Sequence, residues 1–435
     1  MTVELRDQLS ELCAVIDDEQ GPITTDFIEA RDDEVVIIDR PTPRTLPVRS
    51  RWLVAVAAAV AVLVLVGGVA LLFSLTGSET PPANSAQAWS RVPGNEAVFD
   101  QGWMSSVTAG GPGLVAVGSA GDDSAAVWTS VDGLTWSRVP DDSAVFGVED
   151  VEPVLWSVTA GGPGLVAVGS AEDHVAAVWT SVDGTTWFRV PHDDAVFPPG
   201  WMTSVTVGGP GLVAVGGLDP GAAVWTSVDG ITWTRVPHDE TVFGSGVMNS
   251  VTAGGPGLVA VGEDNGNAAV WTSVDGVIWS RVPDDESVFG DPSVLFGGPG
   301  ELSMSSVTAG GPGLVAVGSD NFDAVVWTSV DGVTWSRVPD DDAVLGGDRE
   351  QSMSSVIVGG PGLVAVGGDN WDAAVWTSVD GLTWSRVPDD EAALGGAVRQ
   401  VMNSATVGGS GLVTVGAASP TGYNPDAAVW VTEED

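Results

Sequence analysis

Pairs of adjacent aspartates recur shortly after a repeated Arg-Val-Pro phrase, and they are the side chains in this sequence best suited to bind a cation. Five copies carry such a pair: Asp141 and Asp142, Asp193 and Asp194, Asp284 and Asp285, Asp340 and Asp341, and Asp389 and Asp390. Calcium prefers carboxylate oxygens, but no loop has the regular ligand spacing of an EF-hand. A calcium site and a solvated acidic surface therefore both remain open, and no other metal or cofactor is predicted.

Two aromatic residues occupy matching positions in neighbouring copies, Phe322 in the segment DNFD and Trp371 in DNWD. Aromatic rings present large apolar faces, and in a loop they can stack on a sugar or a peptide side chain. The same rings can instead anchor the loops that carry them. Together with the acidic pairs, these two residues form the candidate binding set.

The residues that catalysis would need do not form a recognisable set. His174, His192 and His238 lack the spacing of a zinc site or of a Ser-His-Asp triad. The glycines of the phrase GGPG join two predicted strands rather than opening a helix, which argues against a phosphate-binding loop. We therefore predict no catalytic residues and do not assign an enzyme activity.

These residues lie in a sevenfold repeat. The phrase GGPGLVAVG begins at Gly110, Gly161, Gly208, Gly254, Gly310 and Gly359, and it returns as GGSGLVTVG at Gly408. Spacings of about 50 residues are typical of propeller blades with four strands each. In the first copy we expect strands over 104–109, 114–118, 125–130 and 135–139, with a glycine turn after the first and an Asp-Gly hairpin after the third.

Tryptophans support the count of seven and indicate how the ring closes. The third strand has one in each copy: Trp128, Trp179, Trp225, Trp271, Trp327, Trp376 and Trp430. The fourth strand has one in only six copies, because the chain ends soon after Trp430. The missing strand is AWSRVP, which contains Trp89, so we expect it to pair beside Trp430. The prediction is an all-β, seven-bladed β-propeller over residues 88–435, closed by an N-terminal strand that removes the exposed sheet edge.

The hairpin after the third strand resembles the Asp-box of BNR-type propellers, which occur in sialidases, sortilin-like receptors and photosystem assembly factors. In the first copy the pattern is Ser130, Asp132, Gly133, Thr135 and Trp136, one residue shorter between Asp and Gly than the usual motif. The hairpin aspartates are Asp132, Asp183, Asp229, Asp275, Asp331 and Asp380. We expect each carboxylate to bond the amides of its own turn, which is a structural role.

Sialidase chemistry is not expected despite this resemblance. In sialidases three arginines grip the substrate carboxylate, and a tyrosine assisted by a glutamate is the nucleophile. Outside the repeated fourth strand, the region after residue 87 has only Arg349 and Arg399, and its only tyrosine is Tyr423.

Alternating strand direction divides the loops between two faces of the predicted ring. The turns after the first and third strands share one face, here called the uniform face, because their sequences hardly vary. The loops after the second and fourth strands share the other, the variable face, where length and composition differ among copies. Binding residues concentrate in variable loops on a rigid scaffold, so the variable face is the candidate binding face.

Charge excludes nucleic acid as a partner. The chain has 58 acidic residues against 15 basic ones, all arginine, and residues 88–435 contain 45 acids and nine arginines. Such a surface repels phosphates. The only cysteine, Cys13, precedes this region, so the predicted propeller contains no disulfide.

Residues 52–75 form a run of 24 residues without a charge, long enough for a helix that spans a bilayer. Four arginines at 40, 44, 49 and 51 precede the run, which places the N-terminus in the cytoplasm by the positive-inside rule. Residues 1–51 are then a cytoplasmic segment with a short helix, either disordered or covered by a partner. Residues 76–87 are a linker, and the propeller lies outside the membrane.

The sequence thus predicts a single-pass cell-membrane protein, of bacterial type, whose extracytoplasmic propeller is a non-catalytic binding or scaffold module for an unknown protein or glycan. Its partners are the lipid bilayer, through 52–75, and that ligand. Two alternatives stay open: a divergent glycan hydrolase or lyase, and a transmembrane receptor that signals through residues 1–51.

Overall fold

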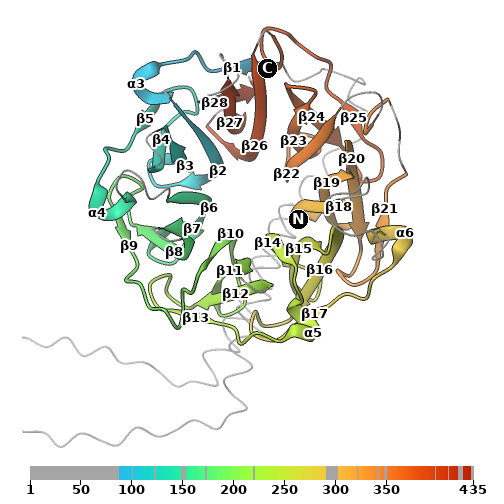
Figure 1. The fold of residues 1–435 in the computed structure, drawn as a ribbon. Coiled ribbons are helices and arrows are strands. Elements are labelled where there is room, and N and C mark those ends of the chain that lie inside the picture. The colour runs from blue at the N-terminus through green and yellow to red at the C-terminus, as the bar shows by residue number, and fades with distance from the viewer. Residues whose placement is uncertain are drawn as a thin grey trace, which may run out of the picture. The chain divides into compact units, whose positions relative to one another are not determined.

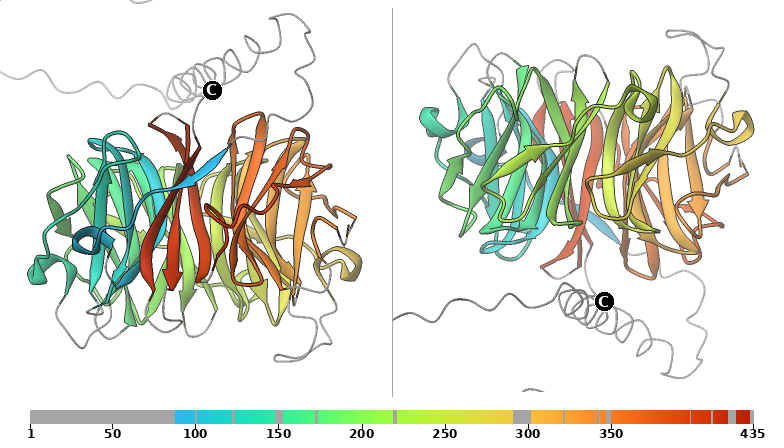
Figure 2. Two further views of the ribbon diagram at one scale, coloured as in Figure 1. Left: turned by 90° about the horizontal axis from the view of Figure 1, so that it is seen from above. Right: turned by 90° about the horizontal axis from the view of Figure 1, so that it is seen from below.

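The computed structural model describes residues 88–432, except positions 100, 122–123, 148–152, 172–173, 219–220, 291–301, 321, 340, 342, 347–349, 397, 410 and 420–424. The described chain forms seven four-stranded antiparallel sheets arranged as the blades of a ring (Figure 1). Side views show the strands running steeply between the two faces of the ring (Figure 2). The predicted all-β, seven-bladed propeller is confirmed.

In blades 1 to 6 the strand order from the axis outward follows the sequence, and the first three blades span residues 102–235. Blade 1 consists of β2 (Gly102–Gly110), β3 (Gly113–Ala120), β4 (Ala125–Ser130) and β5 (Trp136–Arg138). Blade 2 consists of β6 (Val154–Gly161), β7 (Gly164–Ala171), β8 (Val175–Ser181) and β9 (Trp187–Arg189). Blade 3 consists of β10 (Gly200–Gly208), β11 (Gly211–Leu218), β12 (Ala222–Ser227) and β13 (Trp233–Arg235).

The next three blades repeat this plan. Blade 4 consists of β14 (Val247–Gly254), β15 (Gly257–Asp264), β16 (Asn267–Ser273) and β17 (Trp279–Arg281). Blade 5 consists of β18 (Leu302–Gly310), β19 (Gly313–Asp320), β20 (Asp323–Ser329) and β21 (Trp335–Arg337). Blade 6 consists of β22 (Gln351–Gly359), β23 (Gly362–Asp369), β24 (Asp372–Ser378) and β25 (Ser385–Arg386).

Blade 7 joins the two ends of the domain. It consists of β26 (Arg399–Gly408), β27 (Gly411–Ser419), β28 (Asp426–Thr432) and β1 (Trp89–Arg91). Trp89 pairs with Thr432, and Arg91 pairs with Trp430, so β1 is the outermost strand of this sheet. The predicted ring closure is confirmed.

The innermost strands differ from their predicted bounds. In blade 1 the first strand covers 102–110 rather than 104–109, and the register to β3 shifts between Met104 and Ser106. All seven blades have this β-bulge, in which one extra residue faces no partner. The outermost strand is shorter than predicted, 136–138 rather than 135–139, since Thr135 belongs to the turn bonded to Asp132.

Four short helices lie in the loops between blades, at the periphery of the ring (Figure 1): α3 (Glu96–Phe99), α4 (Ser143–Phe146), α5 (Glu240–Phe243) and α6 (Glu286–Phe289). Each ends on a buried phenylalanine. The sequence analysis treated these segments as loops. A short helix forms there because an aspartate or asparagine caps its first amides and the phenylalanine is buried three positions after it begins.

The core consists of seven apolar clusters, each between two neighbouring blades. The third-strand tryptophans are at most 2% exposed, and each donates its indole N–H to a carbonyl in the preceding interblade loop; Trp179, for example, donates to Val145 at 2.7 Å. The fourth-strand tryptophans are also buried and mostly donate to their own hairpin, as Trp136 does to Gly133. The third-strand and the fourth-strand tryptophans, each of which forms a ring around the propeller, therefore serve packing.

The two faces are arranged as the sequence predicts. A Cβ on Gly111, in the first turn of blade 1, would lie 3.1 Å from the carbonyl oxygen of Asp183, in the hairpin of blade 2. On the variable face, the backbone amide of Gln400 donates to the carbonyl oxygen of Trp371. This bond joins the first strand of blade 7 to the loop between β23 and β24 of blade 6.

Within the described part of residues 88–432, no helix is long and apolar enough to cross a membrane. The segment 52–75 lies outside the described residues, as do the expected helix near the N-terminus and the linker 76–87.

Candidate functional site

One aspartate of each predicted acidic pair caps the segment that follows it, which is a short helix after Asp142 and Asp285 and a turn after Asp193, Asp341 and Asp390. Asp142 accepts the amide of Ala144 at 3.0 Å, and Asp285 accepts that of Ser287 at 3.0 Å. Asp193, Asp341 and Asp390 accept an amide two residues ahead in the same way. These carboxylates stabilise the segments whose backbone carbonyls accept hydrogen bonds from the indole N–H groups of the third-strand tryptophans.

The other members of the pairs mostly contact basic side chains. Asp141 binds Arg138 at 2.7 Å, Asp284 binds Arg281 at 3.0 Å and Asp389 binds Arg386 at 2.9 Å. Asp194 lies 2.8 Å from His192, and Asp340 lies outside the described residues. Among the described residues, no three acidic, histidine or cysteine side chains gather to hold a metal ion. Calcium binding by the pairs stays a prediction without a shared cluster to support it.

The hairpin aspartates bond their own turns, as expected. Asp183 Oδ1 accepts the amides of Thr185 and Thr186 at 2.8 and 2.7 Å, and Oδ2 accepts the Thr186 hydroxyl. Hydrogen bonds to the charged carboxylate, from the amide of Thr186 first, lower the pKa of Asp183 to about 2. The pKa of the other five is lowered for the same reason.

Phe322 and Trp371 are the two predicted aromatic binding residues, and both lie exposed on the variable face, at 64% and 62%. Their backbone carbonyls accept the amides of Gln351 and Gln400, which begin the next blades. The guanidinium of Arg399 lies 5.1 Å from the centre of the Trp371 ring. The loops are therefore anchored through the backbone, while the Phe322 ring is presented to solvent.

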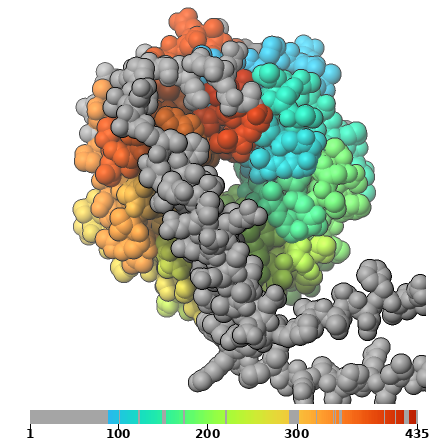
Figure 3. Space-filling model, turned by 180° about the vertical axis from the view of Figure 1, so that it is seen from behind, coloured from blue at the N-terminus to red at the C-terminus, as the bar shows by residue number. Residues whose placement is uncertain are grey.

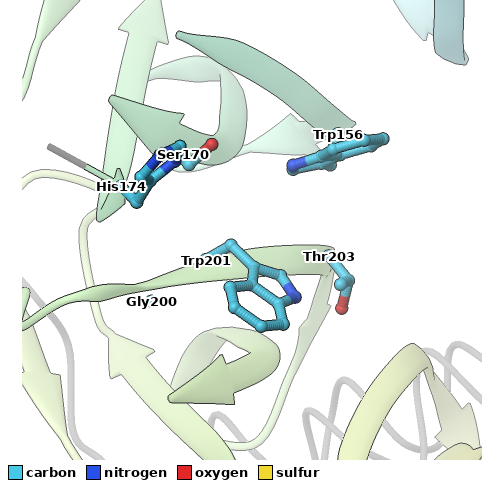
Figure 4. A pocket seen from close by; sticks show the side chains of 6 residues that line it. All are labelled: Trp156, Ser170, His174, Gly200, Trp201 and Thr203. Atoms are coloured by element: carbon cyan, nitrogen blue, oxygen red, sulfur yellow. The ribbon is translucent and has the colours of Figure 1, made fainter. Parts of the chain in front are cut away.

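Three further tryptophans lie on the innermost strands of consecutive blades: Trp103 on β2, Trp156 on β6 and Trp201 on β10. Trp156 and Trp201 are each 39% exposed, unlike the buried tryptophans of the two rings. They line a pocket of about 310 Å³ together with Ser170, His174, Gly200 and Thr203. In Figure 4, Trp156 lies on one side of the opening and Trp201 with Thr203 on the other, while His174 and Ser170 lie at its edge.

The pocket lies at the variable-face end of blades 2 and 3, beside the axis. Gly200 begins β10, Ser170 lies near the end of β7, and His174 precedes β8, all at the end that carries the variable loops. Seen from the side opposite to Figure 1, the ring is open at its centre (Figure 3). Because Trp156 lies on β6 and Trp201 on β10, a ligand in the pocket would lie between these two innermost strands.

The β-bulge gives Trp156 its position. The bulged residues of the other blades are small or polar: Ser105, Thr203, Asn249, Ser305, Ser354 and Asn403. Three of them bridge to the next blade, since Thr203 donates to Met248 O, Asn249 to Met304 O and Asn403 to Met104 O. In blade 2 an indole replaces such a bridging side chain, so the space between β6 and β10 is lined by an aromatic ring.

Two glycines on β11 make room for Trp201. A Cβ on Gly216 would lie 2.0 Å from the carbonyl oxygen of Trp201, so only glycine allows this approach of the bulged backbone. Gly217 pairs with Trp201, and a Cβ there would lie 3.0 Å from the indole.

Serines that follow six of the seven bulges tie neighbouring innermost strands together. The hydroxyl of Ser157 accepts the amide of Val205 at 3.2 Å, which joins β6 to β10 directly below the pocket residues. Five further serines make the same bond around the ring. The two strands that carry Trp156 and Trp201 are therefore fixed relative to each other, and the pocket is largely preformed.

The described lining of the pocket combines aromatic and neutral polar side chains. It offers two indoles, two hydroxyls and one imidazole, and none of these six residues is acidic. The described arginines of the sialidase comparison are not at the pocket: Arg399 stacks on Trp371, and the repeated arginines lie on the outermost strands. Arg349 and Tyr423 lie outside the described residues.

The sequence analysis missed this pocket, although a signal was present. Five tryptophans do not belong to the third or fourth strands, and three of those five fall at the start of consecutive blades. What could not be foreseen is the bulge that turns Trp156 toward blade 3.

Comparison with known proteins supports the fold. YCF48 bound to D1 peptide matches with a TM-score of 0.50 and 14% identity, covering 82% of this chain and 100% of that chain. The extracellular domain of a B. thetaiotaomicron protein assigned to the hybrid two-component systems matches with a TM-score of 0.50 and 10% identity, covering 78% and 39%. The WD40 repeats of RRP9 match with a TM-score of 0.47 and 12% identity, covering 80% and 98%. No family model and no curated protein matches the chain, so the similarity is one of fold, that of a β-propeller.

Proposed function

We propose that this chain is a membrane-anchored, extracytoplasmic binding module whose propeller captures a protein or glycan ligand at the variable face, without catalysing a reaction. The observation on which the proposal depends is the pocket between two exposed indoles, that of Trp156, which replaces the small or polar bulge residue of the other blades, and that of Trp201 on the next innermost strand. Concave sites lined by aromatic rings with a few polar groups are the usual form of a binding site.

Two further observations support this role. The solved structure of YCF48 with D1 peptide is a propeller of similar fold whose name records a bound peptide. The hairpin aspartates bond their turns as the Asp-box resemblance implies, so we assign the Asp-box variant a scaffold role and leave binding to the variable face.

The proposed anchor is the uncharged run 52–75, with residues 1–51 in the cytoplasm. In blade 7, Trp89 pairs with Thr432; in blade 1, Trp136 pairs with Ser130 next to the hairpin on the uniform face. The two pairs occupy equivalent positions, so the chain enters β1 at the uniform face. A tether that joins the propeller at this end leaves the variable face free for ligand.

Two experiments test the proposal. Fusing alkaline phosphatase, which is active only outside the cytoplasm, after residue 87 should give activity, and a fusion after residue 45 should give none; the reverse pattern would overturn the orientation. Screening the full-length chain, in an uncharged detergent, on peptide and glycan arrays should yield ligands that are lost with Trp156→Ala and Trp201→Ala. Ligands that bind both variants as well as the natural chain would place the site elsewhere.

A further inference from the structure

We infer that the pocket between Trp156 and Trp201 accepts the guanidinium group of an arginine side chain on a protein partner. This inference rests on the proposed binding function and narrows it from protein or glycan to a protein segment that presents arginine. Four features of the described residues lead to it.

The first feature is size. A volume of about 310 Å³ lies at the lower end of the range for ligand pockets. It accommodates the end of one long side chain, whereas a glycan of several rings would extend out of it.

The second feature is the small number of polar groups. The Thr203 hydroxyl donates to Val215 O and Met248 O, so its hydrogen is engaged and its lone pairs can only accept. A sugar carries several hydroxyls, and each one buried without a partner costs binding energy. A guanidinium needs only acceptors at its edge and can pack a flat face against an indole.

The third feature is charge. The domain carries 45 acidic residues against nine arginines, so its potential is strongly negative over residues 88–435. Such a field raises the local concentration of cations and opposes anionic glycans and acidic peptides. The field is screened over about 8 Å at physiological salt, which makes the binding dependent on ionic strength.

The fourth feature is the way this chain already pairs its own side chains. The guanidinium carbon of Arg281 lies 5.0 Å from the ring centre of Trp271, and that of Arg386 lies 5.2 Å from Trp376. On the variable face itself, Arg399 lies 5.1 Å from the ring of Trp371. Trp156 and Trp201 offer two exposed indoles of the same kind, and a cation between two aromatic faces gains from both.

The test is an array of immobilised octapeptides probed with the full-length chain in an uncharged detergent, at low and at high salt. Captured peptides should be enriched in arginine at one position, and replacing that arginine by citrulline, which has nearly the same shape without the charge, should weaken the signal at least about tenfold. Trp201→Ala and Trp156→Ala should give the same loss, and Trp201→Phe should keep part of the signal. Phe188→Ala is the control, because Phe188 is exposed on the outermost strand β9, and this variant should retain the signal.

The outcomes separate this inference from the function on which it rests. Equal binding of the arginine and citrulline peptides, or pocket-dependent capture of glycans alone, would overturn the arginine assignment and leave the binding module in place. If every captured ligand binds Trp156→Ala and Trp201→Ala as well as the natural chain, with both variants folded by circular dichroism, both the arginine assignment and the binding function are overturned.

Discussion

The indole N–H of Trp179, on the third strand of blade 2, donates a 2.7 Å hydrogen bond to the backbone carbonyl of Val145, in the loop that leads into that blade. The same bond recurs in every blade, to Val98, Val196, Val242, Val288, Val344 and Ala393. The capping aspartates, the peripheral segments and the buried tryptophans therefore form one repeated interblade joint.

Replacing Trp179 by phenylalanine should destabilise the propeller by roughly 1 to 3 kcal/mol, because the Val145 carbonyl loses its donor in a partly buried site. Urea unfolding of the full-length chain measures this loss. Trp371→Phe, at an exposed position, is the control and should leave the midpoint unchanged. An equal effect of the two changes would show that the interblade bond adds nothing.

Replacing Trp89 by alanine should open the ring. A buried tryptophan reduced to alanine costs about 3 to 5 kcal/mol, and loss of β1 also leaves the β28 edge unpaired. We expect a lower unfolding midpoint together with self-association in light scattering. A variant as stable and as monomeric as the natural chain would contradict closure by β1.

The hairpin aspartates should make stability depend on pH. The folded pKa of Asp183 is about 2, below its unfolded value, so the charged carboxylate stabilises the fold above about pH 4, and this contribution is lost as the pH falls toward 2. Urea midpoints measured from pH 5 to pH 2 should decline, and Asp183→Asn should reduce the slope of the decline. An unchanged slope would remove Asp183 from the account.

Replacing Gly216 by alanine should displace the backbone of Trp201 and so alter the pocket. The added Cβ would lie 2.0 Å from the carbonyl oxygen of Trp201, so the bulged backbone must shift at a cost of about 1 to 3 kcal/mol. Gly368→Ala is the matched control, because its nearest neighbour would lie 3.7 Å away. We expect lower stability and weaker ligand capture only for the first variant; identical behaviour of the two would contradict the described bulge.

The repeat made most of the fold predictable. The phrase around Gly110 and its six counterparts gave the number of blades, and the lone AWSRVP segment gave the closing strand, because both follow from the spacing of residues along the chain. The candidate site was harder to predict from the sequence. Asp142 and its equivalents were interpreted as candidate binding residues, yet a buried phenylalanine or leucine four positions on marks them as caps of a short helix or turn.

The pocket depended on features that spacing does not show. Trp156 lines it because the register of β6 shifts by one residue after Leu155, and Trp201 lines it from the neighbouring blade, where it pairs with Gly217 on β11. Neither the bulge nor the approach of two neighbouring blades follows from one copy of the repeat.

Hydroxyl-radical footprinting with a captured ligand tests the central claim most directly, since it reports the solvent exposure of each tryptophan in the full-length chain. The account predicts that ligand protects Trp156 and Trp201 from oxidation and leaves Trp371 and Phe188 as reactive as before. Protection of Trp371 or Phe188, with Trp156 and Trp201 unchanged, would contradict it.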